Sequence, residues 1–178
     1  IIETEKSLAW VGQNPNHHII TFDDPLYPAL LKTIPDAPPI LFVKGRPEIL
    51  SSPQIAIVGT RHPSLEGKHH SYLFAKELAE RGFIITSGLA IGVDGAHTGA
   101  VENHKKTIAV LGTGIEELYP KRHRKLSELI LENQGALVSE FPLLMSAKAG
   151  NFPRRNRIIA GLSLGTLVVE AARKSGSL

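Results

Sequence analysis

The pattern of hydrophobic and polar positions changes near residue 53. Residues 1–53 contain eight prolines, which break the apolar positions into short pieces. Within this part, the pattern predicts strands at 18–22 and 40–43 and a short helix at 28–34. We therefore expect residues 1–53 to be a lead-in segment whose short strands and helix pack on a regular core, residues 54–178.

From residue 54 onward, short apolar runs alternate with longer amphipathic stretches. The run Ile55-Ala56-Ile57-Val58 is typical of a strand buried on both faces. The expected strands are 55–58, 83–86, 107–111, 136–138 and 166–169. The expected helices are 64–81, 93–103, 121–133 and 154–162. Because strands and helices alternate, we predict an α/β fold with a doubly wound, mostly parallel sheet and helices on both faces.

Glycines follow three of these strands. Gly59, Gly88 and Gly112 stand just after expected strand ends, and Arg61 follows the first of them. Ligands of parallel sheets bind at this edge, where glycine exposes backbone N–H groups and helix N-termini carry partial positive charge. Any one of these glycines could serve only a tight turn. Three at one edge, beside Arg61, favour an anionic ligand, most simply a phosphate.

The segment Phe152-Pro153-Arg154-Arg155-Asn156-Arg157 places an aromatic ring beside three arginines. Guanidinium groups bind phosphate oxygens and stack on bases, and an aromatic ring offers a platform for an unpaired base. Asn156 could read a base edge or pin a loop. An equally weighted alternative places Phe152 in the core and the arginines on a solvated helix face.

Charge and composition permit nucleic-acid binding without requiring it. The net charge is +3, and the stretches 121–125 and 146–157 are basic and contain no acid. The absence of cysteine excludes disulfides and thiolate metal sites and fits a reducing cytoplasm. No apolar run reaches the ~18 residues of a membrane span, and residues 1–6 do not resemble a signal peptide. We therefore expect a cytoplasmic location.

Enzyme motifs are incomplete or out of context. The stretch 112–117 keeps only the first two glycines of a dinucleotide fingerprint, and no Walker A sequence occurs. Residues 161–165 read Gly-Leu-Ser-Leu-Gly, but the expected order around them is helix then strand, the reverse of a nucleophile elbow. Asp94 and His97 lack a third metal ligand, so a helix cap and a hydrogen-bonded histidine are favoured. We expect no catalytic residue, cofactor or metal site.

An ordered set of motifs nevertheless resembles the DNA-processing protein A family (DprA, also called Smf), and it covers nearly the whole chain. The matching residues are Ile57–Arg61, Ser87–His97, Ile108–Gly114, Tyr119-Pro120, Ser139–Pro142, Phe152–Ser163, Val168–Ala171 and Ser175–Leu178. Tyr27-Pro28 and Leu41–Gly45 also resemble the family's lead-in. The resemblance implies an extended Rossmann-like fold. A helical domain usually precedes this core and more sequence usually follows it, so we expect the chain to stop short of the protein's C-terminus.

The same resemblance implies a function. It implies single-stranded DNA binding in a basic pocket and loading of the RecA recombinase during bacterial natural transformation and recombination, without catalysis. It also implies a homodimer for the full-length protein. Together with the sheet-edge argument, it gives these expected DNA-binding residues: Gly59, Thr60, Arg61, Ser87, Gly88, Gly112, Lys148, Phe152, Arg154, Arg155, Asn156 and Arg157.

Two alternatives remain open at this point. The segment 161–166 with Glu170 faintly resembles nucleoside-monophosphate phosphoribohydrolases, in which case Arg157 would hold the phosphate and Glu170 would assist glycosidic cleavage. The other alternative is a protein-interaction scaffold with no ligand in the crevice. It requires Asp94 and Glu140 to neutralise the cations internally.

Overall fold

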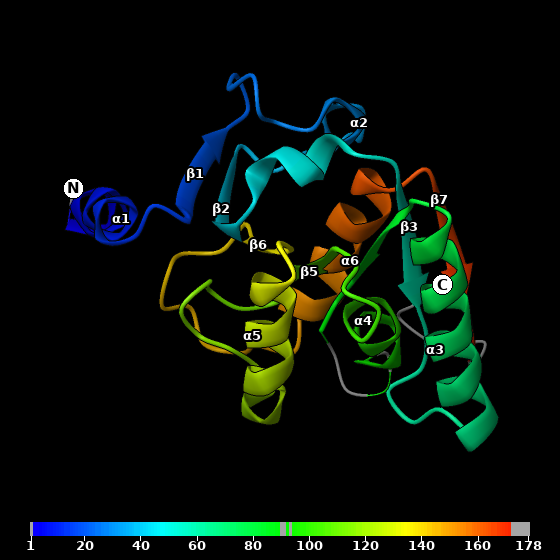
Figure 1. The fold of residues 1–178 in the computed structure, drawn as a ribbon. Helices are drawn as coiled ribbons and strands as arrows, with labels where there is room; N and C mark the ends of the chain where they lie inside the picture. Colours follow the sequence, from blue (N-terminus) through cyan, green and yellow to red (C-terminus); the bar gives the residue numbers. More distant parts are fainter. Residues whose placement is uncertain (1, 90–91, 93, 172–178) are drawn as a thin grey trace.

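A seven-stranded sheet organises the molecule (Figure 1). The structure, a computed structural model, describes residues 2–89, 92 and 94–171. The motif residues Ala90, Ile91 and Val93 and the segment 175–178 therefore lie outside the described residues. The strand order is β1-β2-β6-β5-β4-β3-β7. The neighbouring pairs from β6 to β7 are parallel, whereas β1–β2 and β2–β6 are antiparallel.

The elements follow the expected alternation. The first part contains α1 (Ile2–Gln13), β1 (His17–Thr21), α2 (Ala29–Lys32), β2 (Ile40–Gly45) and the 3-10 helix η1 (Pro47–Ser51). The first half of the core contains β3 (Gln54–Val58), α3 (Leu65–Glu80), β4 (Ile84–Ser87), α4 (Asp94–Val101) and β5 (Thr107–Val110). The second half contains η2 (Lys121–His123), α5 (Arg124–Glu132), β6 (Ala136–Ser139), α6 (Asn151–Leu162) and β7 (Gly165–Val168).

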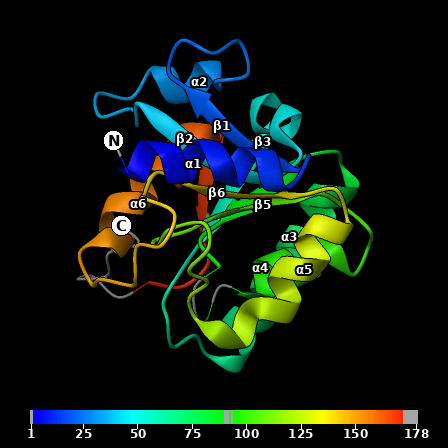
Figure 2. The same cartoon turned by 90° about the vertical axis from the view of Figure 1, so that its left-hand side faces the viewer.

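Helices cover both faces of the sheet, as expected. Figure 2 shows α3, α4 and α5 on one face and α6 on the other. On the α6 face, Ile158, Ile159 and Leu162 are buried against the sheet together with Leu31 of α2. The helices that follow β3, β4 and β5 lie on the first of these faces, and α6, on the opposite face, connects β6 to β7. The expected α/β fold with a doubly wound, mostly parallel sheet is confirmed.

Three local expectations are corrected. The helix expected at 154–162 begins at Asn151, because Pro153 is accommodated in its first turn. The helix expected at 121–133 begins as the 3-10 turn η2. The helix α1 was not predicted at all. Within the described residues, no helix combines the length and apolar composition that crossing a bilayer requires.

Helix α1 is held mainly by a single buried side chain. Trp10 is 3% exposed and stacks on His17, with ring centroids 4.2 Å apart. Its indole Nε1–H donates to the carboxylate of Glu116, which also forms an ion pair with Lys44 at 2.8 Å. Burial raises the pKa of Glu116, but hydrogen bonds from Lys44 and Trp10 outweigh it, so that this pKa is lowered. The lead-in segment is thereby tied to the loop that follows β5.

Candidate nucleic-acid interface

The candidate site lies where the parallel strands end. Because β3 to β7 run in the same direction, their carboxyl ends share one edge of the sheet, the lower edge in Figure 1. The loops that follow them begin with Gly59, Gly88, Leu111, Glu140 and Val169. The first turn of α6, residues 151–154, approaches the same edge through Phe152 and its neighbours. The loops at this edge and the start of α6 therefore contain most of the expected site residues.

Gly88 makes room for a buried arginine of α6. Arg155 is 3% exposed, and its Nη1 donates to the carbonyl oxygens of Gly88, at 2.9 Å, and Val110. A Cβ on residue 88 would stand 2.6 Å from Arg155 Nη2. Burial, with a smaller contribution from Arg61, lowers the Arg155 pKa to about 10. Arg155 therefore holds α6 to the ends of β4 and β5, and its charge has main-chain carbonyls as acceptors.

Gly112 supports an exposed aromatic and cationic cluster. A Cβ on residue 112 would lie 2.6 Å from Phe152 Cδ1, so the ring packs directly on the glycine. The guanidinium carbon of the exposed Arg61 lies 5.5 Å from the Phe152 ring centroid. The ring of Tyr119, a residue that is 48% exposed, also contacts Phe152, with the two ring centroids 5.6 Å apart. The cluster combines an accessible cation with two aromatic rings, the groups that a phosphate and an unpaired base require.

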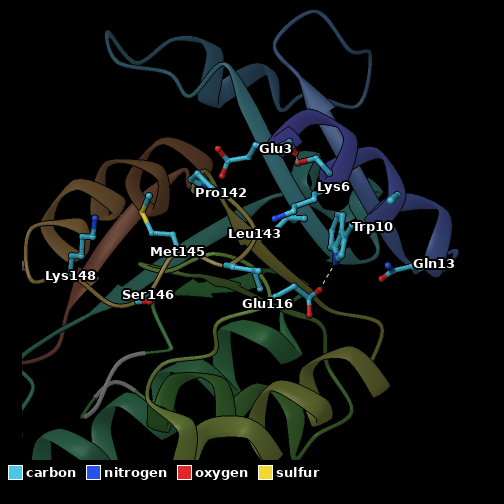
Figure 3. Close-up of a pocket in the computed structure, with 13 residues that line it drawn as sticks. Glu3, Lys6, Trp10, Gln13, Glu116, Pro142, Leu143, Met145, Ser146 and Lys148 are labelled. Atoms are coloured by element: carbon cyan, nitrogen blue, oxygen red, sulfur yellow. Dashed lines mark hydrogen bonds between the residues drawn. The ribbon is translucent and has the colours of Figure 1, made fainter. Parts of the chain in front are cut away.

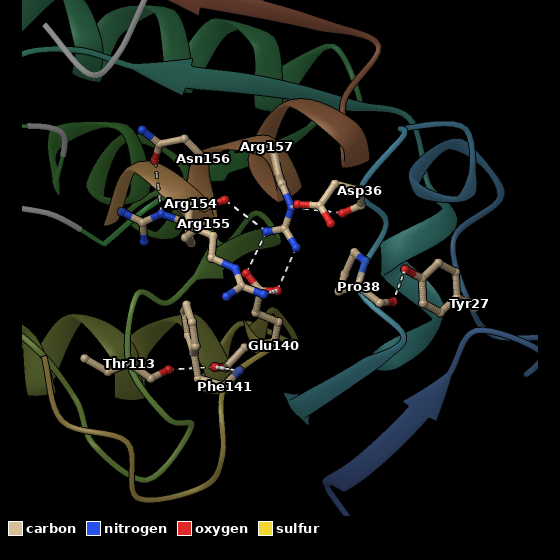
Figure 4. A network of polar contacts seen from close by, with 11 residues as sticks. Tyr27, Asp36, Pro38, Thr113, Glu140, Phe141, Arg154, Arg155, Asn156 and Arg157 are labelled. Atoms are coloured by element: carbon tan, nitrogen blue, oxygen red, sulfur yellow. Dashed lines mark hydrogen bonds and ion pairs between the residues drawn. The ribbon is translucent and has the colours of Figure 1, made fainter. Parts of the chain in front are cut away.

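Arg157 is already paired within the protein (Figure 4). Its Nη1 and Nη2 donate to the two carboxylate oxygens of Glu140, at 2.6 and 2.7 Å, and its Nε lies 3.0 Å from Asp36 Oδ2. The hydrogen bond from Arg157 to Glu140 is the main reason that the Arg157 pKa is raised. Arg154 lies 3.5 Å from Glu140 with 60% of its side chain exposed. Arg157 thus joins α6 to the lead-in segment, whereas Arg154 stays accessible.

The residues that follow β3, and Ser87 at the end of β4, form hydrogen bonds within the protein. Thr60 donates its N–H to the carbonyl of Glu170 at 2.6 Å, and its hydroxyl accepts the N–H of His62 at 3.2 Å. A Cβ on Gly59 would lie 3.2 Å from that same Glu170 carbonyl. Ser87 is 1% exposed and donates its hydroxyl to the carbonyl of Ile57 at 2.6 Å, which joins β4 to β3.

Two backbone N–H groups at the N-terminus of α3, those of Ser64 and Gly67, have acceptors within the protein. Ser64 caps the helix, accepting the Gly67 N–H at 2.9 Å. The Glu170 carboxylate accepts hydrogen bonds from the N–H and hydroxyl of Ser64, at 2.9 and 3.1 Å. A protein carboxylate therefore occupies the place where the sequence suggested a ligand phosphate, since a helix N-terminus favours any anion. A phosphate at this helix end stays a prediction.

Lys148 lies on the exposed loop between β6 and α6. It is one of the residues that line a groove of about 940 Å³ between α1 and this loop. Figure 3 shows it on the opposite side of the groove from Trp10, on the same side as Met145 and Ser146. Lys148 is thus an accessible cation close to the start of α6.

The expected site residues differ in exposure, and Gly59, Thr60, Gly88, Asn156 and Arg157 are intermediate. Arg61, Lys148 and Arg154 are exposed cations, and Phe152 is half-buried beside Arg61. Ser87, Gly112 and Arg155 are buried. Asn156 accepts a hydrogen bond from Arg155 Nε at 3.2 Å through its Oδ1. Tyr119 was not predicted as a site residue, because nothing in the sequence pattern indicates that the loop after β5 contacts the first turn of α6.

The residues of the alternative functions have other partners. Ser163 follows the end of α6 and precedes β7, and its hydroxyl donates to the Ile159 carbonyl at 2.9 Å, so the helix-then-strand order is confirmed. Arg157 and Glu170, required for glycosidic cleavage, are engaged with Glu140 and with Ser64 respectively.

His97 lies deep behind the site. It is fully buried, and its Nδ1 lies 2.8 Å from Thr107 Oγ1. The Thr107 hydroxyl donates to the Ile85 carbonyl, so Nδ1 carries the hydrogen and Nε2, which has no partner within the described residues, is unprotonated. Burial is the main cause that lowers the His97 pKa to about 3. The side chain of Asp94 lies outside what the structure describes, and no group of three metal-ligating side chains occurs among the described residues.

Comparison with known proteins now decides the family. The sequence model of the family described as DNA recombination-mediator protein A matches residues 18–178. This chain belongs to that family. The family resemblance drawn from the sequence is therefore confirmed.

Relatives in this family are similar over most of the chain. Protein Smf of Escherichia coli (strain K12) is 53% identical over 98% of this chain and 46% of its own length. DNA processing protein DprA of Streptococcus pneumoniae is 43% identical over 87% of this chain and 55% of its own length. This chain therefore spans about half the length of these relatives.

Solved structures of family members show the same fold. The X-ray structure of DprA from Streptococcus pneumoniae matches with a TM-score of 0.86 and 38% identity, covering 97% of this chain and 60% of that one. DprA from Helicobacter pylori matches with a TM-score of 0.78 and 30% identity, covering 90% of this chain and 73% of that one. The second structure was solved to describe the single-stranded DNA binding mode of that protein.

Proposed function

We propose that this chain binds single-stranded DNA at the carboxyl edge of its sheet. The observation that carries the proposal is the exposed Arg61 guanidinium, 5.5 Å from the centroid of the Phe152 ring and beside the half-exposed Tyr119. An unpaired base can stack on such rings while the adjacent cation binds its phosphate. Duplex DNA keeps its bases paired and stacked internally, so this arrangement favours the single strand.

In this proposal the expected residues divide into contacting and positioning roles. Arg61, Lys148, Phe152 and Arg154 contact the strand, because their side chains are wholly or partly exposed. Gly88, Gly112 and the buried Arg155 hold α6 at the distance that keeps Phe152 beside Arg61. The remaining expected residues, which act through these, are Gly59, Thr60, Ser87, Asn156 and Arg157.

The proposal extends to the whole protein. Membership of a recombination-mediator family supports a role in loading RecA onto single-stranded DNA, in the cytoplasm and without a catalytic step. The engagement of Arg157 and Glu170 by protein partners also supports a binding rather than a hydrolytic role. Stimulation of RecA-dependent ATP hydrolysis on single strands measures loading. The homodimer of the full-length protein stays a prediction from the resemblance.

The test of the central proposal is binding of a fluorescently labelled single strand, compared with duplex DNA and with AMP. We expect binding that prefers the single strand and weakens with salt, with a log–log slope of about −0.7 per phosphate neutralised. Equal binding of duplex would contradict the role of the aromatic rings. Release of adenine from AMP, abolished by Glu170→Gln, would replace the proposal with the glycosidase alternative.

A further inference from the structure

The loop that carries Arg61 is held at both ends by one residue, Glu170. The backbone carbonyl of Glu170 accepts the N–H of Thr60 at 2.6 Å. Its carboxylate Oε2 accepts the N–H and the hydroxyl of Ser64, at 2.9 and 3.1 Å. Thr60 directly precedes Arg61, and Ser64 is the N-cap residue of α3. Glu170 therefore joins the two ends of the segment 60–64, while the Arg61 side chain between them stays exposed.

The backbone of Glu170 is itself fixed by the sheet. The Val169 N–H donates to the Val58 carbonyl at 3.0 Å, which extends the parallel pairing of β7 with β3 toward residue 170. In Figure 1, the loop runs from the lower end of β3 to the start of α3. The Glu170 side chain thus connects the end of one strand to the start of a helix, and the position of the loop follows from both.

A glycine in the first turn of α3 makes room for this carboxylate. Gly67 is buried, and a Cβ on it would overlap Oε2 of Glu170. Glycine within a helix is less favourable than alanine, so the helix alone gives no reason for a glycine here. Among the residues that the structure describes, no basic side chain forms an ion pair with Glu170. The carboxylate is therefore directed at the loop and the helix start rather than at a cation.

We propose that Glu170 is a positioning residue for single-stranded DNA, which holds the segment 60–64 so that the Arg61 guanidinium stays beside the Phe152 ring. This inference rests on the proposed function, because Arg61 is taken to bind a phosphate. A loop that is already ordered loses less conformational freedom when the strand binds, which raises the affinity. A negative charge near this loop otherwise repels phosphates, so electrostatics alone predicts tighter binding when Glu170 is neutralised. The positioning role predicts weaker binding.

The test measures the affinity of five variants for a labelled oligothymidine. Glu170→Ala removes the carboxylate, whereas Gly67→Ala displaces it and keeps its charge. Glu66→Gln, at an exposed position in the same helical turn as Gly67, is the matched control for the loss of one negative charge. Arg61→Ala and the double variant Arg61→Ala/Glu170→Ala form a cycle, because the effects of residues that act through one another are not additive.

We expect Glu170→Ala and Gly67→Ala to bind the strand about threefold to tenfold more weakly than the unmodified protein, since the loop must then be ordered on binding. Glu66→Gln should bind at least as tightly as the unmodified protein, because it loses only a repulsive charge. In the Arg61→Ala background, Glu170→Ala should cause no further loss. Thermal unfolding checks that each variant is folded. Gly67→Ala carries the test if Glu170→Ala is unfolded, because alanine favours a helix.

Unchanged or higher affinity of Glu170→Ala and Gly67→Ala, beside a clear loss for Arg61→Ala, would overturn this inference alone. An equal loss from Glu170→Ala in both backgrounds would also overturn it, because Glu170 would then act independently of Arg61. If Arg61→Ala binds the strand as the unmodified protein does, the proposed function itself has failed, and this inference fails with it.

Discussion

At the residue scale, two glycines determine how closely α6 approaches the sheet. Gly88 and Gly112 lie against Arg155 and Phe152, and a Cβ on either glycine would come within 2.6 Å of the neighbouring side chain. The sequence located these glycines correctly at the sheet edge but suggested that they admit a ligand. In the structure they lie against side chains of the protein: Gly112 against Phe152, which we propose to contact DNA, and Gly88 against Arg155, which we propose to position α6.

Replacing Gly112 by Ala should therefore impair both folding and binding. The added methyl group forces the Phe152 ring away from its position, which we expect to lower the free energy of unfolding by about 1–3 kcal/mol. We also expect weaker binding of single-stranded DNA, up to about tenfold, because the displaced ring stacks less well on a base. Urea unfolding and fluorescence anisotropy measure the two effects. The control is Gly165→Ala, where a Cβ meets nothing within 4 Å; equal affinities of the two variants would refute the role assigned to Gly112.

His97 should make stability depend on pH. Burial lowers its pKa in the folded protein to about 3, from an ordinary value of 6.5. Between these values the unfolded chain binds a proton that the folded protein does not, so stability is lost as the pH falls from about 6.5 toward 3. The contribution of this one residue reaches about 1.4 kcal/mol for each pH unit.

The measurement is urea unfolding at several pH values between 7 and 4. His97→Gln should be less stable at pH 7, because a packed ring is lost, but its stability should fall less steeply with decreasing pH than that of the unmodified protein. His69→Gln, at an exposed position of α3, controls for the removal of a histidine. Parallel curves for the unmodified protein and His97→Gln would show that His97 is not buried as a neutral ring.

At the element scale, α5 should become more stable when a cation at its start is replaced by an acid. Arg124 is the first residue of α5, whose first turn contains no acidic side chain. Arg124→Glu should raise the free energy of unfolding by about 0.3–1 kcal/mol at low salt, because a carboxylate there interacts favourably with the helix dipole. Thermal unfolding at low and high salt measures the gain and its screening. A loss of stability would mean that Arg124 has a structural partner.

Helix α1 depends on one contact rather than on its own pattern. Its apolar residues cluster at 8–11 instead of recurring along one face, which explains why the sequence did not predict it. Trp10→Ala should increase the rate of amide hydrogen exchange throughout α1, while β3 to β6 keep their protection. Leu8→Ala, at a 65% exposed position of the same helix, is the control. Unchanged exchange in α1 would show that Trp10 does not anchor it.

The arginines of α6 have different surroundings that the sequence motif does not reveal. Successive residues of a helix point about 100° apart, so the neighbouring arginines 154, 155 and 157 face different surroundings. One is exposed, one is buried against main-chain carbonyls and one is paired with Glu140. The sequence identified the segment but could not assign these roles, because each depends on a residue from another element.

At the scale of the whole molecule, the local patterns predicted the architecture better than the site. Short apolar runs bounded by glycines marked all five parallel strands, since strands buried on both faces need apolar residues throughout. The order of the strands was not predicted. That β1 and β2 extend the same sheet beside β6 depends on pairing between Phe42 and Ser139 and their neighbours, over nearly a hundred residues of chain. Local patterns carry no information on pairing at that distance.

Two exposed arginines at opposite edges of the sheet allow a direct test of whether DNA binds at the carboxyl edge. Arg61 and Arg81 are both exposed arginines, one before the start of α3 and the other at its end. They therefore lie near opposite edges of the sheet and carry the same charge. If DNA binding were due only to net positive charge, replacing either by Ala would weaken it equally.

The decisive measurement is the affinity of Arg61→Ala and Arg81→Ala for a labelled single strand at two salt concentrations. We expect Arg61→Ala to lose about tenfold or more in affinity at low salt and to reduce the salt slope by about 0.7, because one phosphate contact is removed. Arg81→Ala should bind as the unmodified protein does. Equal affinities of the two variants would contradict a DNA-binding site at the carboxyl edge of the sheet.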